Sequence, residues 1–365
     1  MNILLLSAYD TDSHQSWCKG LMQHLPEINW GYLSLPGRYF SWRIRGNPLS
    51  WAMGAQAEML QQNYDLIIAT SMVDLATLKG LVPNLAKTPS IMYFHENQFA
   101  YPKSQQQHAS IEPQMVNLYS ALSSDKVLFN SQYNLNSFMK GATELLNKLP
   151  DHVPCGVLDK IQAKSFVVPV PINRPTQEPQ DNLLQSQASY KPLKIIWNHR
   201  WEYDKGPELL YEVISLALKQ GCLMQFIIAG LSFRQVPPAL KALQADKFTN
   251  VIHMGTFQKK NDYINALKES HVVLSTALHE FQGLAMLEGA AHGCIPLAPN
   301  RLAYPEWVNK NYLYEDSKDV HTQAAEIVDI LNQWQEKGLP EKIDVSGYYW
   351  QNLIAQYQGH LKGGY

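Results

Sequence analysis

The sequence has few cysteines and no long hydrophobic run, and each shortage excludes a class of protein. Its four cysteines, Cys18, Cys155, Cys222 and Cys294, form no Cys-x-x-Cys pair. This argues against a zinc ribbon and favours free thiols in a reducing, cytoplasmic compartment. No stretch approaches about 18 apolar residues, so we expect no membrane partner and no spanning helix. The first residues lack the basic region of a signal peptide, which favours a buried first strand.

Charged residues are also scarce. They make up 17% of the 365 residues, and the formal net charge is −2, whereas about a quarter of residues is typical. A nucleic-acid partner would therefore need a local basic patch. His95-Glu96 and His279-Glu280 do not extend to His-Glu-x-x-His, because Phe99 and Gly283 stand where the second histidine would be. We therefore expect no metalloprotease. None of the predicted strands ends at an Asp-x-Asp string, so we also expect no metal cofactor.

Short apolar segments alternate with helical patterns in both halves of the chain, which predicts an α/β protein with parallel sheets. Strands are expected at 3–7, 30–35, 65–69, 90–94, 126–129, 194–197, 223–229, 251–254, 272–275 and 295–298. Helices are expected at 16–24, 52–62, from 132 onward behind a Ser131 cap, and at 206–219, 238–245, 261–270 and near 284–292. The pattern predicts two Rossmann-like domains, 1–173 and 193–345, a Pro- and Gln-rich linker at 174–192, and a closing helix in 346–365.

The most informative stretch runs from His279 to Glu288 and reads His-Glu-Phe-Gln-Gly-Leu-Ala-Met-Leu-Glu. It predicts a loop carboxylate, Glu280, then a glycine turn and a helix that carries Glu288. The N–H groups of Gly283, Leu284 and Ala285 would lie at the helix N-terminus, where a phosphate binds well. One acid on each side of that phosphate matches the layout of a nucleotide-sugar, which is sugar, diphosphate, ribose.

Two basic residues follow the predicted strand at 194–197. Arg200 offers a planar fork and Lys205 a point charge, and together they suit a diphosphate. The alternative is a solvated loop arginine and a lysine at a helix start. Glu288 has two interpretations as well, because a carboxylate in an apolar helix must find partners or face solvent.

Further polar residues lie in the first half. His95 ends a predicted strand, where it could act on a substrate or simply bond to nearby main chain. Cations and aromatics are mixed at 38–45, and Trp42, Arg43 and Arg45 suit stacking on bases and contact with phosphates. The alternative is a solvated loop whose aromatic residues pack into the core.

Several strings resemble known families. Arg200 to Gly206 and the Glu280/Glu288 pair resemble the Arg…Lys-Gly and Glu-x7-Glu elements of family 4 retaining glycosyltransferases, which have the GT-B fold. The strings Trp-Arg-Ile-Arg-Gly at 42–46, Tyr-Phe-His-Glu-Asn-Gln at 93–98 and Asn-His-Arg-Trp-Glu at 198–202 are similar to one subfamily, the tRNA-queuosine α-mannosyltransferases.

The resemblance implies two Rossmann-like domains that face a central cleft. It also implies a particular reaction. Mannose would move with retention from GDP-mannose to the cyclopentene hydroxyl of queuosine in a tRNA anticodon. The partners would be the nucleotide sugar and this tRNA, without a metal or an obligate protein partner. Another donor or acceptor, a sugar-nucleotide epimerase on the same fold, and a binding protein without activity remain alternatives.

The resemblance also implies roles for individual residues. His95 and Glu280 would lie at the sugar and the reacting carbon. Donor contacts would come from Arg200, Lys205, Gly283, Leu284, Ala285 and Glu288. The resemblance supports acceptor contacts for Trp42, Arg43 and Arg45, and Asn97 and Gln98 are further candidates. Many family members have glycines after the first strand, where this chain has Tyr9, Asp10, Ser13 and His14. These bulkier polar residues suggest acceptor contact, and the alternative is an ordinary polar loop. Arg301, Tyr304 and Glu306 would line the cleft or hold a structural turn.

Overall fold

The computed structural model describes residues 1–101, 110–176, 191–231, 236–246 and 248–363. The chain divides into two compact units. Unit 1 holds Met1–Pro171 together with the segment from Trp350 onward, and unit 2 holds Ile172–Tyr349. Most of the predicted linker at 174–192 lies outside the described residues.

Unit 1 is built on a parallel sheet with strand order β2-β1-β3-β4-β5-β6. Its strands are β1 (Asn2–Asp10), β2 (Asn29–Pro36), β3 (Leu66–Thr70), β4 (Ser90–Phe94), β5 (Lys126–Phe129) and β6 (Ser165–Val167). Its helices are α1 (Asp12–His24), α2 (Phe40–Ala52), η1 (Ala57–Gln61), α3 (Leu75–Leu81), α4 (Pro83–Ala86), α5 (Glu112–Ser123), α6 (Gln132–Leu146), α7 (Val157–Gln162) and α13 (Trp350–Lys362).

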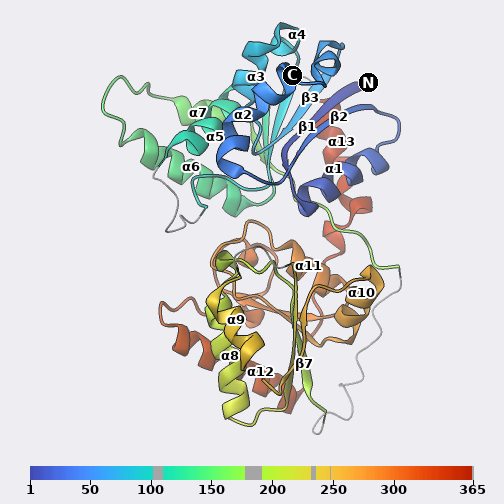
Figure 1. Ribbon diagram of the computed structural model, residues 1–365, viewed down its shortest axis with the longest axis vertical. Helices are drawn as coiled ribbons and strands as arrows, with labels where there is room; N and C mark the ends of the chain where they lie inside the picture. The colour runs from blue at the N-terminus through green and yellow to red at the C-terminus, as the bar shows by residue number, and fades with distance from the viewer. Residues whose placement is uncertain (102–109, 177–190, 232–235, 247, 364–365) are drawn as a thin grey trace. The chain divides into compact units, whose positions relative to one another are not determined.

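Helices cover both faces of this sheet. α1 and α13 lie on one face, and α2, α3, α5, α6 and α7 lie on the other (Figure 1). Strands covered on both sides are apolar throughout, and Ile3, Leu4, Leu5 and Leu6 of β1 are fully buried, as expected for a parallel sheet. The carboxyl ends of the strands form one edge, where such sheets bind ligands.

Unit 2 repeats this architecture with strand order β12-β11-β10-β7-β8-β9, again parallel. Its strands are β7 (Leu193–Trp197), β8 (Met224–Ala229), β9 (Val251–Gly255), β10 (Val272–Leu274), β11 (Ile295–Pro299) and β12 (Leu313–Tyr314). Its helices are η4 (Tyr203–Lys205), α8 (Pro207–Lys219), α9 (Pro238–Ala245), α10 (Lys260–Glu269), α11 (Leu284–Ala291), η5 (Tyr304–Glu306), η6 (Lys310–Tyr312), α12 (Val320–Lys337) and η7 (Ser346–Tyr348). α8, α9 and α12 cover one face, and α10 and α11 the other (Figure 1).

The predicted strands are all present, and two of them, β4 and β5, have the predicted bounds. Ser131 caps α6 as predicted, because its hydroxyl accepts a hydrogen bond from the N–H of Asn134 at 3.0 Å. The helices α3, α4, α5, α7 and α12 and the strands β6 and β12 were not predicted, although Asp74 caps α3 and Asp319 caps α12.

The helix predicted at 52–62 was wrong. A regular helix, α2, occupies Phe40–Ala52, and only the short η1 follows it. Pro48 lies inside α2 and has no N–H to donate to the carbonyl of Ile44, which usually disfavours a helix. The side-chain amide of Asn47 compensates, because it donates to the carbonyls of Ile44 at 3.3 Å and Arg43 at 2.7 Å.

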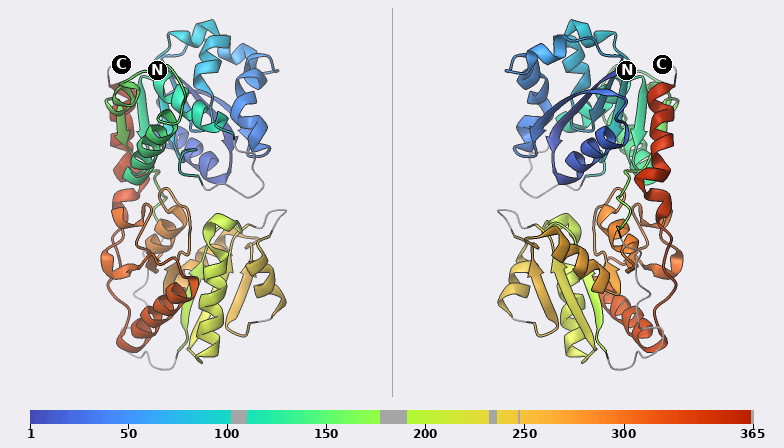
Figure 2. Two further views of the ribbon diagram at one scale, coloured as in Figure 1. Left: turned by 90° about the vertical axis from the view of Figure 1, so that its left-hand side faces the viewer. Right: turned by 90° about the vertical axis from the view of Figure 1, so that its right-hand side faces the viewer.

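The closing helix, α13, packs on α1 within unit 1 (Figure 2). The Trp350 ring stacks on His24 at a centroid distance of 4.7 Å. A Cβ at Gly20 would lie 2.1 Å from the Trp350 ring, so this approach requires glycine. Deeper in the helix, the Tyr357 hydroxyl accepts a hydrogen bond from Trp17 at 2.9 Å.

Candidate active site

The turn between β10 and α11 is the predicted anion-binding part of unit 2. Gly283 is the residue before α11 and has φ 85°, a left-handed conformation that favours glycine. A Cβ there would also lie 2.8 Å from the Tyr304 ring. The N–H groups of Leu284 and Ala285 open the helix and, with the helix dipole, form the expected phosphate site.

Lys205 lies beside this turn and joins it to the loop after β7. Its ammonium contacts a carboxylate oxygen of Glu280 at 3.2 Å and one of Asp204 at 3.2 Å. It also donates to the His279 carbonyl at 3.1 Å. Only 9% of the Lys205 side chain is exposed. The solvated lysine of the alternative interpretation is therefore excluded by burial.

Gly206 explains why Lys205 can lie so close to this turn. It has φ 63°, and a Cβ on it would lie 1.9 Å from the Thr276 carbonyl oxygen. Thr276 completes the junction, because its hydroxyl donates to the Lys205 carbonyl at 2.8 Å. The glycine of the Lys-Gly string is thus needed for packing between the two loops.

The charges in this cluster depend on one another. Burial acts to raise the pKa of Glu280, but the charge of Lys205 outweighs it and holds the pKa at about 2. Burial likewise acts to lower the pKa of Lys205, but Glu280 and Asp204 raise it above its usual value. Burial, aided by Lys205, lowers the pKa of His199 to about 4. At neutral pH, Glu280 and Lys205 are charged and His199 is neutral.

Arg200 is more open than Lys205, with 43% of its side chain exposed. Its guanidinium contacts Glu202 at 3.1 Å. Burial raises the pKa of Glu202, although the Arg200 charge opposes this. An incoming diphosphate would have to compete with Glu202 for the arginine.

Glu288 is half-buried and has a defined partner. The Tyr263 hydroxyl donates to its carboxylate at 2.9 Å. The Asn198 amide donates to the Tyr263 oxygen at 3.0 Å and to the Ala285 carbonyl at 2.9 Å. The chain of bonds fixes Glu288 on α11, in contrast to the outward-facing acid of the alternative interpretation. Tyr263 was not predicted, because its contact with α11 depends on the packing of α10.

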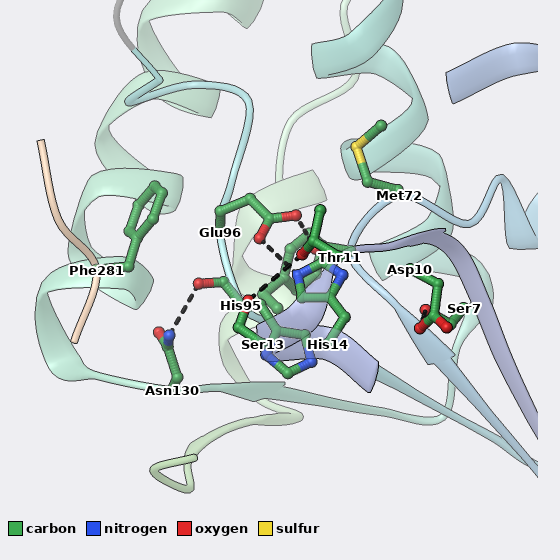
Figure 3. Close-up of polar contacts among 12 residues, drawn as sticks. Ser7, Asp10, Thr11, Ser13, His14, Met72, His95, Glu96, Asn130 and Phe281 are labelled. Atoms are coloured by element: carbon green, nitrogen blue, oxygen red, sulfur yellow. Dashed lines mark hydrogen bonds and ion pairs between the residues drawn. The ribbon is translucent and has the colours of Figure 1, made fainter. Parts of the chain in front are cut away.

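In unit 1, His95 follows β4 and is buried, with 7% exposure. Its ring stacks on the His14 ring at 4.2 Å, and its carbonyl accepts a hydrogen bond from Asn130 at 2.8 Å (Figure 3). The Nε2 atom of His95 has no hydrogen-bond partner within the described structure. His14 itself pairs with Glu96 at 3.0 Å.

The other predicted acceptor residues lie at the end of β1 and on the first turn of α1, not in a loop as predicted. Asp10 accepts hydrogen bonds from Ser7 at 2.9 Å and from Tyr32 at 2.9 Å. Ser13 is exposed on the first turn of α1, and the Tyr9 ring packs edge-on to Phe40 at 6.2 Å. Asp10 is therefore well supplied with partners, whereas Ser13 is open to a ligand.

Trp42, Arg43 and Arg45 lie on α2 and differ in their surroundings. Trp42 is 50% exposed. Arg45 contacts Asp74 at 2.6 Å and Glu112 at 3.1 Å, so two carboxylates compensate its charge. Arg43 is half-buried, and its Nε has no partner among the described residues. The structure thus favours Trp42 and Arg43 as contact residues over Arg45.

Asn97 and Gln98 face inward. Asn97 is fully buried, and its amide donates to Asn134 Oδ1 at 2.8 Å and to Ser137 at 2.9 Å. The Gln98 side chain lies against the Met72 sulfur at 3.8 Å. Burial argues against the acceptor contact predicted for Asn97, which instead holds the loop after β4 to α6.

The stretch after β11 forms a structural turn. Tyr304 is fully buried, and its hydroxyl bonds to Ser275 at 2.6 Å. Arg301 donates to the Ala277 carbonyl at 3.0 Å and pairs with Asp316. Glu306 is exposed in η5. For Arg301 and Tyr304 these contacts support the structural interpretation.

One aspartate pair bears on metal binding. Asp10-Thr11-Asp12 is an Asp-x-Asp string at the end of β1, a kind of carboxylate pair that can hold a divalent ion. Within the described ranges, no three or more His, Cys, Asp or Glu side chains are grouped so as to hold a metal. The absence of a metal requirement stays a prediction. Of the helices in the described part of the chain, none is long and apolar enough to cross a membrane.

Comparisons with known proteins agree with the two units. Residues 2–172 match the family model of the tRNA-queuosine alpha-mannosyltransferase N-terminal region, and residues 180–350 match that of glycosyl transferases group 1. A tRNA-queuosine alpha-mannosyltransferase of Drosophila melanogaster is 32% identical over 320 residues, which cover 87% of this chain and 84% of that protein.

Solved structures show the same fold at low identity. Sucrose-phosphate synthase from Thermosynechococcus elongatus has a TM-score of 0.68 and 13% identity, covering 99% of this chain and 98% of that one. TarM has a TM-score of 0.55 and 15% identity, and the match covers 82% of this chain and 55% of TarM. The fold is therefore GT-B. Because of its identity with the Drosophila protein, the chain belongs to the tRNA-queuosine alpha-mannosyltransferase family.

Proposed function

We propose that this protein transfers mannose, with retention, from GDP-mannose to the cyclopentene hydroxyl of queuosine in a tRNA anticodon. The observation that carries the transferase function is the cluster in unit 2, where Lys205 and Glu280 lie beside the N-terminus of α11. Family membership supports the choice of donor and acceptor.

Unit 2 would hold the donor. The diphosphate would accept hydrogen bonds from the first N–H groups of α11 and pair with Lys205 and Arg200. Glu288 is fixed by Tyr263 at 2.9 Å, and its carboxylate would accept hydrogen bonds from the ribose hydroxyls. Glu280 is charged at neutral pH because Lys205 lies beside it, so it would accept a hydrogen bond from a hydroxyl of the sugar.

The chemistry would be a displacement on one face of the sugar. The bond between the anomeric carbon and the diphosphate oxygen breaks, and a bond to the acceptor oxygen forms on the same face. The proton of the acceptor hydroxyl passes to the leaving diphosphate oxygen. Lys205 and the α11 N-terminus would stabilise the negative charge that develops there. His95 Nε2, which has no partner within the described residues, would bond to a hydroxyl of the transferred sugar.

Unit 1 would bind the acceptor through the start of α2. Trp42 is 50% exposed and Tyr39 is 68% exposed. The Arg38 guanidinium lies 5.5 Å from the centre of the Tyr39 ring. Exposed aromatic rings beside cations are suited to unpaired bases and phosphates of an RNA loop. Arg43 adds a second cation, while Arg45 is compensated by Asp74 and Glu112.

The experiment compares donors and acceptors directly. The full chain is incubated with queuosine-containing tRNA and, separately, with GDP-mannose, GDP-glucose and UDP-glucose, and nucleoside mass is measured. We expect a hexose on queuosine from GDP-mannose alone. A hexose on tRNA that lacks queuosine, or transfer from another donor, would assign a different glycosyltransferase.

Two control reactions separate the other classes. A changed sugar nucleotide formed without any acceptor would identify an epimerase. A wild type as inactive as Glu280→Ala with every donor would indicate a binding protein. Salt-dependent tRNA binding, weakened by Arg43→Ala, is expected if phosphate contacts contribute, and no binding at low salt would contradict the tRNA acceptor.

A further inference from the structure

Three side chains in unit 1, Glu96, His14 and His95, contact one another in that order, and we call this group the stack. Glu96 and His14 have no part in the reaction described above. The rings of His14 and His95 lie 4.2 Å apart, with 26° between their planes. The Nε2 atom of His14 lies 3.0 Å from a carboxylate oxygen of Glu96. The other carboxylate oxygen of Glu96 accepts a hydrogen bond from Ser71. Figure 3 shows His14 between the carboxylate and the second ring.

The stack is buried, and two of its ring nitrogens, His95 Nε2 and His14 Nδ1, have no side-chain hydrogen-bond partner in the described residues. His14 is 4% exposed and His95 is 7% exposed. The Nε2 atom of His95 is shielded from solvent, yet it bonds to no group in the described residues. Buried polar atoms without partners are rare in proteins. A bound substrate that supplies the missing partner would remove this cost, so the atom marks where a ligand contacts unit 1.

We propose that Glu96 and His14 are positioning residues: Glu96 holds a protonated His14 ring flat against His95, which fixes the His95 ring and keeps it uncharged. This inference rests on the proposed function, in which His95 meets the transferred sugar. It gives His14 a role inside the protein in place of the predicted acceptor contact. It also explains why a glutamate follows the histidine at the end of β4.

Burial and charge support this division between the two rings. Burial acts to lower the pKa of His14, but the charge and hydrogen bond of Glu96 outweigh it, and the pKa is raised above its usual value. For His95, burial and the charge on His14 both lower the pKa well below its usual value. Two positive rings in face-to-face contact would repel each other. The stack is therefore most stable with one positive charge, and Glu96 places it on His14.

The other groups around the two rings do not oppose this arrangement. The charge of Asp10, at the end of β1, also raises the pKa of His14. Tyr93 of β4 lies 4.7 Å from the His95 ring, and burial raises the pKa of Tyr93 well above its usual value, so it stays neutral. Trp17 of α1 packs edge-on against His95 at 4.8 Å and carries no charge.

An uncharged His95 suits the proposed reaction. Positive charge builds up on the sugar as the diphosphate leaves. A second positive charge on His95 would oppose that build-up, whereas a neutral ring can still form a hydrogen bond through Nε2. The ring must also keep its orientation, since a small misplacement of a group near the reacting atoms is costly in rate.

The first test needs neither donor nor acceptor. The histidine rings of the full chain are labelled with ¹³C and ¹⁵N, and their titration is followed by NMR. In wild type we expect His95 to stay neutral through the neutral range and His14 to lose its proton above its ordinary pKa. Glu96→Gln should lower the pKa of His14 and raise that of His95. Glu58→Gln, an exposed change in η1, should alter neither.

The second test uses activity. Glu96→Gln keeps a hydrogen-bonding group but removes the negative charge beside His14. His14→Phe keeps a flat ring but removes the positive charge beside His95. Each should lower kcat, on the order of a hundredfold if the ring is misplaced, with little change in the KM for GDP-mannose. The alkaline decline of kcat, where His14 loses its proton, should move to lower pH in Glu96→Gln. If these variants unfold, Ser71→Ala should show a smaller loss of kcat in the same direction.

The outcomes separate this inference from the proposed function. Unchanged titration of His14 and His95 in Glu96→Gln would overturn the inference, as would a folded His14→Phe with wild-type kcat. A wild type that transfers no mannose would overturn the proposed function alone, because the NMR titration would still report on the stack.

Discussion

The Tyr263 hydroxyl donates a hydrogen bond to the Glu288 carboxylate at 2.9 Å, which joins α10 to α11 on one face of the unit 2 sheet. Asn198 bonds to the same tyrosine oxygen at 3.0 Å. The carboxylate proposed to bind ribose is thus held in place before any donor arrives. Such preorganisation lowers the entropic cost of ordering this side chain when the donor binds.

Removal of this hydroxyl should therefore weaken donor binding. Tyr263→Phe keeps the ring but loses a hydrogen bond to a charged group, worth about 1.5–3 kcal/mol. We expect the Kd for GDP to rise roughly tenfold, since about 1.4 kcal/mol corresponds to a factor of ten. Calorimetry of GDP binding measures this. Tyr211→Phe, on the far side of the sheet in α8, is the control, and equal Kd values for both variants would contradict the role of Tyr263.

Lys205 should be needed for stability as well as for transfer. Lys205→Met removes the charge that Glu280 and Asp204 share in a buried site. Loss of one partner of a buried pair costs about 3–5 kcal/mol, so we expect a lower free energy of unfolding in urea. The double variant Lys205→Met/Glu280→Gln should recover part of this stability but no activity. Full stability of the single variant would contradict the pairing.

The acid stability of unit 2 should depend on Glu280. Its pKa of about 2 lies below the ordinary 4.5, so its stabilising contribution is complete above about pH 4.5 and is lost as the pH falls toward 2. Between about pH 5 and pH 3, wild type should lose roughly 2 kcal/mol more than Glu280→Gln in its free energy of unfolding. Urea titrations at both pH values provide the comparison, and parallel losses would show that the carboxyl is not perturbed.

The indole of Trp42 should depend for its position on the space that Gly46 leaves by having no side chain. A Cβ at Gly46 would lie 2.4 Å from the Trp42 ring. Gly46→Ala should therefore displace Trp42, and both Gly46→Ala and Trp42→Ala should raise the KM for tRNA while the KM for GDP-mannose stays the same. Base stacking is worth about 1–3 kcal/mol, which corresponds to a roughly 5- to 150-fold change.

A matched glycine variant controls for the helix. A Cβ at Gly80, in α3, would meet nothing within 4 Å, so Gly80→Ala should leave both KM values unchanged. If Gly46→Ala and Trp42→Ala also leave the KM for tRNA unchanged, the start of α2 is not the acceptor surface.

The closing helix should stabilise unit 1 through Tyr357. This hydroxyl receives a hydrogen bond from Trp17 at 2.9 Å and bonds to the Pro169 carbonyl at 2.8 Å. Tyr357→Phe leaves both buried groups short of a partner, at a cost of about 1–3 kcal/mol. Thermal unfolding should begin at a lower temperature than in Tyr119→Phe, where the altered ring is 50% exposed.

Many elements of the fold were predictable because their signals are local. Most strands of the two sheets are short apolar runs bounded by polar residues, and they lie where they were predicted, except for β6 and β12, which were not predicted. α2 was missed because Pro48 and Gly46 suggest a turn. Within the helix, the Asn47 amide donates to the Ile44 carbonyl, which Pro48 leaves without a backbone donor.

In the candidate site, too, some residues could be predicted from local sequence signals and others could not. Glu280, Gly283 and Glu288 were predictable from their spacing, since a glycine between a strand and a helix has a specific backbone role. Tyr263 gave no signal, because its contact with Glu288 spans 25 residues and two helices. The same is true of Asn97, whose burial against α6 could not be inferred from its place beside His95.

By itself, the sequence determined the alternation of strands with helices, the glycine turn before α11 and the family resemblance, because each depends on neighbouring residues. Only the tertiary structure decided the partners of each polar group. It placed Arg45 between two carboxylates, Lys205 between Glu280 and Asp204, and His14 between Glu96 and His95. Charge and hydrogen bonding depend on distance in space, and folding brings together groups that lie as many as 340 residues apart, as in Trp17 and Tyr357.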